Sequence, residues 1–319
     1  MTTSRWLTPA LVLVGLVALA QWTVAHTLWV RLSDAGPAVI LLTALGLLGS
    51  HVLRALRLHA EWHPRRGVGR IECLRVALLH SAAVNLMPMR SGELGFPWLL
   101  WRRWQVPVIA SARSLLWMRL QDALVLLWMG AMTACARVAG DGPAALAWSA
   151  LAAVMATAGL VALSVRPPAR PMYGPTPEAM PATRAARLHV MFDEARRALA
   201  GASPATWTWC IANWGLKVAT LATLMAVLSG DRAWVGWCAA LGGELAAAVP
   251  VQAPAGFGTY EAASALGARL AGAPEFETML AAALVAHLAA LVFTLSGAAV
   301  AGLAGHPRVA PWPGAVEIR

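Results

Sequence analysis

Eight polar side chains of this 319-residue chain lie in or beside apolar stretches, where charges are unusual. A charge within a membrane-spanning helix costs about 2.5–3.5 kcal/mol on insertion scales, so it normally faces a protein interior or a water-filled cavity. Cations in such a cavity can bind a phosphate group, and a tyrosine can hydrogen-bond a lipid headgroup or anchor the chain at the membrane interface. The eight candidates for substrate binding are Arg90, Glu93, Arg119, Asp122, Lys217, Glu244, Tyr260 and Glu261.

Two interpretations of these residues stay open. In the first, three cations bind a phosphate in a polar cavity, and two glutamates position those cations or carry protons. Its residues are Arg90, Arg119 and Lys217 with Glu93 and Glu261. In the second, the charges form ion pairs within the membrane that only fix the register of neighbouring helices. The pairs would be Arg119 with Asp122 and Lys217 with Glu244.

Proline and glycine interrupt the apolar pattern beside two of these glutamates, Glu93 and Glu261. Proline lacks a backbone N–H, and glycine adopts conformations that other residues resist, so both stretches predict a break in a helix at membrane depth. Non-helical backbone is tolerated there only against protein or a water-filled cavity. The helix that restarts after each break presents free N–H groups, which attract anions such as a phosphate headgroup. The interrupting residues are Pro88, Gly92, Pro254, Gly256 and Gly258.

The composition indicates a polytopic, all-α membrane protein. Hydrophobic residues make up 59% of the chain and charged residues 13%, about half the usual charged share of roughly 25%. An apolar run of about 20 residues crosses the bilayer core as a helix, and one soluble domain could not bury seven such helices. We therefore predict about 7–8 spans. The apolar runs cover residues 7–30, 36–53, 115–134, 144–165, 207–228, 234–249 and 279–303.

The two halves of the chain share one pattern of elements. An apolar segment, at 71–87 in the first half and 234–249 in the second, leads to a break, then to a turn proline and a long helix. About 14 residues separate each break from its turn, which gives about 21 Å of helix, too little for a core of about 30 Å. We predict two re-entrant hairpins, near 85–105 and 250–272, in an internal repeat typical of transporters. Chance similarity of the halves is the alternative.

The charges of the loops indicate the topology. Arginines gather after the second apolar run, from Arg54 to Arg75, and again between 166 and 204, so both regions and the N-terminus are expected in the cytoplasm. This topology accounts for the net charge of +10, and we expect no nucleic-acid partner. The predicted domains are an N-terminal membrane half (1–165), a Pro/Arg-rich linker with an amphipathic helix (166–204), a C-terminal membrane half (205–305) and a tail (306–319).

Signatures of catalysis are absent from the sequence. It contains no G-x-x-x-x-G-K-[ST], H-E-x-x-H, G-x-S-x-G or G-x-G-x-x-G motif. Its four cysteines are scattered and give no metal-ligand spacing. We therefore expect no enzymatic activity, no cofactor and no metal, and any transport would be passive or driven by a gradient.

Three segments resemble the transmembrane-region family of lysylphosphatidylglycerol synthetases, also called flippase-like membrane proteins. They are NLMPMRSGELG (85–95), ASARSLLWMRLQDAL (110–124) and VPVQAPAGFGTYEAAS (249–264). The resemblance extends from about residue 5 to 305 and assigns the family's patterned positions to Arg90, Gly92, Glu93, Arg119, Asp122, Gly256, Gly258 and Glu261. This chain has Ala255 where the family often has glycine, and His287 where it often has arginine.

The resemblance implies lipid translocation without aminoacylation, because no soluble aminoacyl-transfer domain accompanies the membrane region. We accordingly expect a bacterial inner-membrane protein that moves an anionic or modified lipid, either a phospholipid or a polyprenyl-linked lipid, between leaflets. One alternative is a membrane-embedded enzyme that modifies lipid headgroups, with Glu93 or Glu261 as general base. Another is a non-catalytic partner of a lipid-biosynthesis enzyme.

Overall fold

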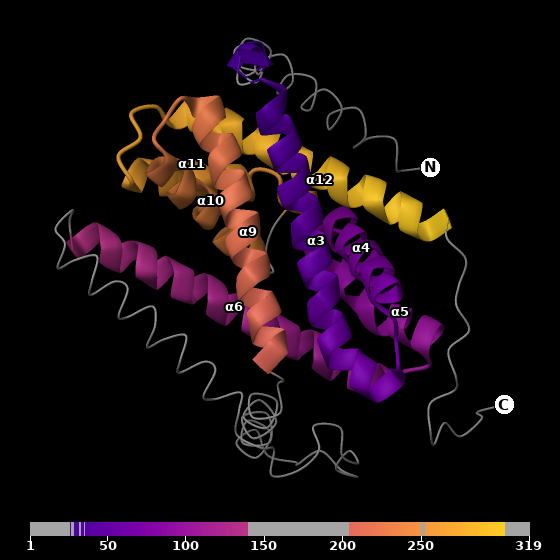
Figure 1. Ribbon diagram of the computed structural model, residues 1–319. Coiled ribbons are helices and arrows are strands. Elements are labelled where there is room, and N and C mark those ends of the chain that lie inside the picture. The colour runs from indigo at the N-terminus through magenta and orange to yellow at the C-terminus, as the bar shows by residue number, and fades with distance from the viewer. Residues whose placement is uncertain are drawn as a thin grey trace, which may run out of the picture.

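The computed structural model describes residues 36–139, 204–249 and 253–303, with a few positions between 26 and 34 (Figure 1). Every regular element in these ranges is a helix, so the all-α class is confirmed for the described part of the chain. Four predicted features lie wholly or mostly outside the described residues. They are the apolar runs at 7–30 and 144–165, the linker with its amphipathic helix at 166–204, and the tail at 306–319.

Four of the described helices are long and apolar enough to cross a membrane. With 26 to 32 residues each, they extend for about 39–48 Å at 1.5 Å per residue, more than a hydrocarbon core of about 30 Å requires. Four of the predicted apolar runs fall within them, and the chain is a multi-pass membrane protein. The helices are α3 (Pro37–Arg66), α6 (Val108–Ala139), α9 (Pro204–Ser229) and α12 (Phe276–Leu303).

A short helical hairpin connects α3 to α6. Its base is held by an ion pair between Arg103 and Glu72, whose Nη1 and Oε1 atoms are 2.8 Å apart. Nearer the tip, the rings of His80 and Phe96 pack with centroids 5.0 Å apart. As residue numbers rise from Glu72 to His80 in one arm, those of their partners fall from Arg103 to Phe96 in the other, so the two arms are antiparallel. The elements are α4 (Arg70–Leu86), η1 (Pro88–Leu94) and α5 (Gly95–Trp104).

A second short hairpin connects α9 to α12, and glycines let its arms touch. A Cβ atom added at Gly242 would collide with the carbonyl oxygen of Ala263, and one added at Gly267 would collide with that of Cys238. Small residues allow helix backbones to approach this closely in membrane proteins. The elements are α10 (Ala233–Ala248), η2 (Pro254–Gly256) and α11 (Thr259–Leu270).

The chain leaves α-helical geometry at both predicted interruptions. After α4 it forms a single 3-10 stretch in which Arg90 has φ 55°, a left-handed value that is unusual for a residue other than glycine. After α10 it passes through Ala255 at φ 56° and through Gly256 and Gly258 at φ 84° and 82°. Left-handed backbone is sterically easy for glycine alone, so the glycines at 256 and 258 suit this turn.

The two halves interlock. The order long helix, short hairpin, long helix occurs twice, as α3 to α6 and as α9 to α12. In Figure 1, α3 and α9 lie side by side, and α12 crosses the bundle to contact α4. Helix α10 packs on α6, and η1 touches η2. The tips of the two hairpins therefore meet inside the bundle of long helices.

Replacing Gly92 with alanine tests how tightly the first tip packs. An added Cβ would collide with the carbonyl oxygen of Ala83 in α4, which is backbone and cannot swing away. We expect Gly92→Ala to lower the free energy of unfolding by about 1–3 kcal/mol, measured as a lower Tm in detergent micelles. Gly95→Ala is the matched control, because its Cβ would meet the methyl of Ala83 at an ordinary 3.6 Å. Equal Tm values for the two variants would contradict this packing.

Candidate functional site

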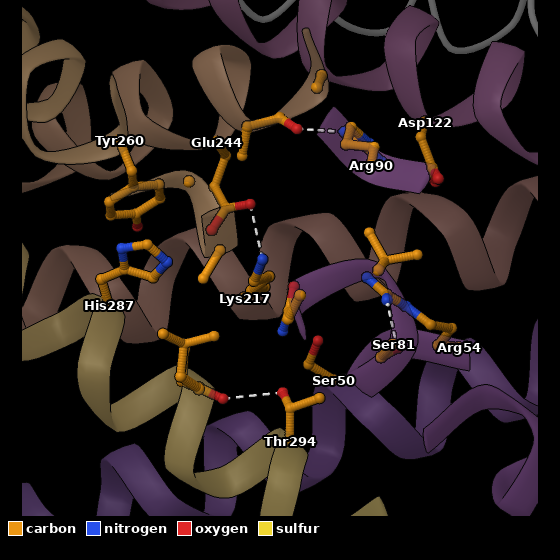
Figure 2. Close-up of a pocket in the computed structure, with 18 of the residues that line it drawn as sticks. Ser50, Arg54, Ser81, Arg90, Asp122, Lys217, Glu244, Tyr260, His287 and Thr294 are labelled. Atoms are coloured by element: carbon orange, nitrogen blue, oxygen red, sulfur yellow. Dashed lines mark hydrogen bonds and ion pairs between the residues drawn. The ribbon is translucent and has the colours of Figure 1, made fainter. Parts of the chain in front are cut away.

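A cavity of about 460 Å³ lies where the two hairpin tips meet the long helices (Figure 2). Both halves contribute to its wall, and most of its charged side chains are among those singled out in the sequence. Seven of the eight predicted residues line it: Arg90, Glu93, Arg119, Asp122, Lys217, Glu244 and Tyr260. The eighth, Glu261, is buried and not among the lining residues.

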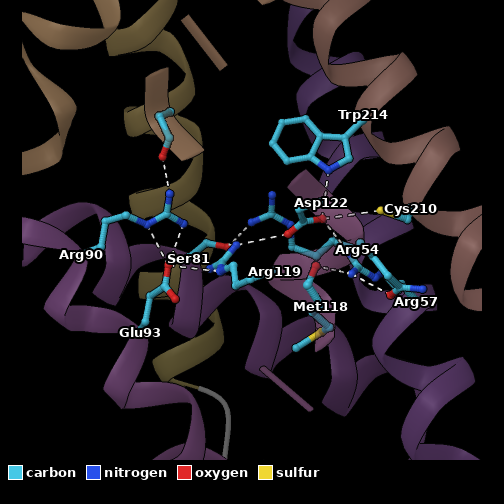
Figure 3. Close-up of polar contacts among 12 residues, drawn as sticks. Arg54, Arg57, Ser81, Arg90, Glu93, Met118, Arg119, Asp122, Cys210 and Trp214 are labelled. Atoms are coloured by element: carbon cyan, nitrogen blue, oxygen red, sulfur yellow. Dashed lines mark hydrogen bonds and ion pairs between the residues drawn. The ribbon is translucent and has the colours of Figure 1, made fainter. Parts of the chain in front are cut away.

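Arg90 joins the two hairpin tips. Its guanidinium forms an ion pair with Glu93, with Nε 2.7 Å from Oε1, and Arg119 of α6 lies 3.1 Å from the same oxygen (Figure 3). Nη1 of Arg90 also donates to the carbonyl oxygen of Ala247, near the end of α10. The last turn of a helix leaves carbonyl groups without partners, and this arginine satisfies one of them. The Arg90 guanidinium of one tip therefore satisfies a backbone carbonyl group that the helix end before the other tip leaves without a partner.

Asp122 organises the opposite wall. Its Oδ1 accepts from Arg57 Nη1 at 2.6 Å and from Trp214 Nε1 at 2.9 Å, while Arg119 Nη1 lies 3.3 Å from Oδ2 (Figure 3). Arg57 is 3% exposed and also donates to the amide oxygen of Gln121. The network ties α3, α6 and α9 together. The shared carboxylate supplies a counter-charge to both arginines inside the protein, although a single negative charge cannot neutralise two positive ones.

Lys217 and Glu244 form the ion pair of the second half. Nζ of Lys217 lies 2.7 Å from Oε2 of Glu244, which is 2% exposed. The ammonium also lies 5.3 Å from the centre of a Trp214 ring, within cation–π range. Both ion pairs of the second interpretation, this one and that between Arg119 and Asp122, are therefore present, and all four side chains also line the cavity.

Glu261 fixes the second tip from behind the cavity wall. Its Oε2 accepts from the backbone N–H of Gly258 at 2.6 Å, and its Oε1 lies 2.7 Å from Nδ1 of His287 in α12. The His287 ring packs on the rings of Tyr260 and Phe257, with centroids 4.6 and 5.1 Å away. Tyr260 is buried, so it is not an interface anchor. This geometry anchors the start of α11 to α12.

The two motif glutamates have equivalent partners. Glu93 pairs with Arg119, and Glu261 pairs with His287; each glutamate stands 26 residues before a basic residue of the next long helix. His287 therefore stands in the second half where Arg119 stands in the first, and each contacts the glutamate of its own half. The shared spacing extends the internal repeat from helix order to side-chain pairing.

The sequence pattern assigns to a loop two arginines that the structure places at or behind the cavity wall. Arg54 and Arg57 follow an apolar run that ends at residue 53, but α3 continues to Arg66 and places both inside a candidate span. Arg54 lines the cavity, and Arg57 holds Asp122 from behind. A signal existed: Ser50, Arg54 and Arg57 recur at helical spacing, on one face of a continuing helix.

Removing the charge of Asp122 tests the network. Asp122→Asn leaves Arg57 and Arg119 without a shared counter-charge, and breaking a buried pair in this way costs about 3–5 kcal/mol. We expect a clearly lower Tm of the detergent-purified protein. Glu277→Gln is the control, because Glu277 is exposed in the first turn of α12. A similar small change in both variants would show that the network adds little stability.

Comparison with known proteins is consistent with the geometry. The family described as Lysylphosphatidylglycerol synthase TM region matches residues 6–297, nearly the whole chain. No curated protein and no solved structure matches the sequence. The family match covers both hairpins and every charged side chain of the cavity wall. The chain, with its two hairpin tips and charged cavity, belongs to the Lysylphosphatidylglycerol synthase TM region family.

Proposed function

We propose that the protein moves an anionic or modified lipid between the leaflets of the membrane, through the cavity between the hairpin tips. The family links the chain to membrane lipids, through their modification or their transport. The observation that carries the proposal is the charged cavity itself, surrounded by four helices long enough to cross a membrane. Charges between membrane-spanning helices are costly, and they often mark a pathway for a polar or charged group.

The hairpins are proposed to be re-entrant, each entering and leaving from one side of the membrane. Helix α5 has 10 residues and α11 has 12, which gives about 15 and 18 Å, well short of a core of about 30 Å. Their antiparallel partners and their meeting tips support this arrangement. With the two apolar runs outside the described residues, at 7–30 and 144–165, the four candidate spans would become six in a two-half repeat, and a total of 7–8 would require hairpin arms that also cross the membrane.

Alternating access would then work by moving the tips apart. The contact to separate is that between Arg90 and the carbonyl oxygen of Ala247, which joins η1 to the end of α10. Arg90 also has a left-handed backbone, and strained residues of this kind often occur in switching segments. A headgroup that competes for the Arg90 guanidinium would loosen this contact, so binding would favour opening.

We propose a carrier rather than an enzyme. A general base must have an oxygen aimed at a substrate proton. Both oxygens of Glu261 are engaged by Gly258 and His287, so it has none for this role. Oε1 of Glu93 is held by Arg90 and Arg119, which leaves Oε2 as the oxygen of Glu93 that an enzyme would have to use. The proposed setting is the bacterial inner membrane with a cytoplasmic N-terminus, and a lipid-biosynthesis enzyme is the proposed partner.

The test is translocation of a labelled phospholipid in reconstituted vesicles. We expect the parent protein to move the label between leaflets and Glu93→Gln to slow it by about tenfold or more, because Glu93 orients two cavity arginines through charge-assisted hydrogen bonds. Glu261→Gln should mainly lower Tm, because Glu261 does not line the cavity. Glu277→Gln, on the exposed start of α12, is the control. The carrier would be rejected if the label moved between leaflets as fast in vesicles with Glu93→Gln, and in vesicles without protein, as in vesicles with the parent protein.

A further inference from the structure

Arg54 has no carboxylate partner among the described residues. It projects from α3 into the cavity, where Nη1 donates to the hydroxyl of Ser81 at 2.9 Å (Figure 2). The neighbouring carboxylate, Asp122, is already held by Arg57 and Arg119. A neutral hydroxyl does not compensate a guanidinium charge inside a membrane protein.

The internal repeat shows where the missing charge would belong. Ser50 and Asn213, which are 163 residues apart, hydrogen-bond to each other at 2.8 Å between α3 and α9. The same offset of 163 relates Arg54 to Lys217 and Ser81 to Glu244. Each cation then contacts the residue 27 positions later, in α4 or α10. The second half has a carboxylate at this position, and the first half has a serine.

The charges of the described cavity wall do not balance. Four cations line the cavity, namely Arg54, Arg90, Arg119 and Lys217. Three carboxylates line it, namely Glu93, Asp122 and Glu244. Each of these carboxylates already contacts at least one cation. Arg57, behind the wall, is a fifth cation and shares Asp122, so a ligand that brings negative charge would reduce the excess of positive charge. A ligand that brings an ammonium group would find no unpaired carboxylate here.

We infer that Arg54 and Ser81 form the headgroup subsite for a phosphodiester that carries one negative charge and no amine. A guanidinium binds phosphate oxygens through two parallel N–H bonds, and the Ser81 hydroxyl can donate a third. The cavity of about 460 Å³ falls within the usual range for small-molecule sites, so it suits a headgroup whose acyl chains remain in lipid. This inference rests on the proposed carrier function for its choice of a lipid as the source of the phosphodiester.

Binding to the full chain tests the inference without any transport. The purified protein in uncharged detergent is titrated with phosphatidylglycerol, phosphatidylethanolamine or lysylphosphatidylglycerol, and the bound fraction is read by native mass spectrometry. We expect phosphatidylglycerol to bind about tenfold or more tightly than the two lipids that contain an amine. Inorganic phosphate forms a separate arm, read by the shift in Tm. Equal affinities for all three lipids would overturn the inference. A Tm shift that depends on Arg54 and occurs with inorganic phosphate alone would overturn the claim that the phosphodiester comes from a lipid.

Variants at the two positions give opposite signatures. Arg54→Gln should weaken phosphatidylglycerol binding about tenfold or more. Arg54→Lys should restore only part of it, because an ammonium keeps the charge but cannot form the two parallel N–H bonds. Ser81→Glu supplies the carboxylate that the second half already has, so it should raise Tm without lipid and also abolish the preference for phosphatidylglycerol. Ser81→Ala adds no carboxylate, so both its effect on Tm and its effect on lipid preference should be smaller. Arg102→Gln is the control, since Arg102 is exposed on α5 beside the Trp98 ring.

The outcomes separate this site from the proposed transport. Arg54-dependent binding without translocation by the parent would reject the carrier and retain the subsite. Translocation with parental affinity in Arg54→Gln and Ser81→Glu would reject the subsite and retain the carrier. If Arg54→Gln does not fold, the decision falls to Ser81→Glu, where unchanged lipid preference would overturn the inference.

Discussion

Compensation of charge at places where the backbone cannot remain helical is the constraint on which the rest of this structure depends. The two hairpin tips carry unpaired backbone groups into the middle of a helical bundle, where such groups must find partners in protein or water. Arg90 satisfies an unpaired backbone group and has its own charge compensated, because it donates to a carbonyl oxygen of α10 and forms an ion pair with Glu93. Through Arg119 and Asp122 the same chain of charges reaches Arg57 on α3.

The two halves meet this constraint in different ways. In the first half, Glu93 faces the cavity between two arginines. In the second, Glu261 is fully engaged by Gly258 and His287 behind the wall. The glutamate of the first tip is therefore open to the cavity and that of the second is held against α12, although both tips carry the same pattern of proline, glycine and glutamate.

The same charged side chains form the ion pairs and line the cavity. Lys217 and Glu244, for example, form an ion pair between α9 and α10 and also line the cavity. A pair at a cavity wall is held by its partner and still offers its remaining hydrogen-bonding capacity to the cavity. The charge that stands apart is Arg54, because its position in the repeat lacks a carboxylate.

The sequence by itself determined the helical membrane class, the breaks beside Glu93 and Glu261, and seven of the side chains that line the cavity. These features depend on short stretches of sequence. Apolar runs, prolines, glycines and charged residues within apolar runs can each be recognised without knowing the fold. Only the tertiary structure decided that Arg54 and Arg57 belong to a span, that Glu261 lies behind the wall, and that the tips meet. These depend on which residues distant in the chain become neighbours, and helical periodicity carries no information about that.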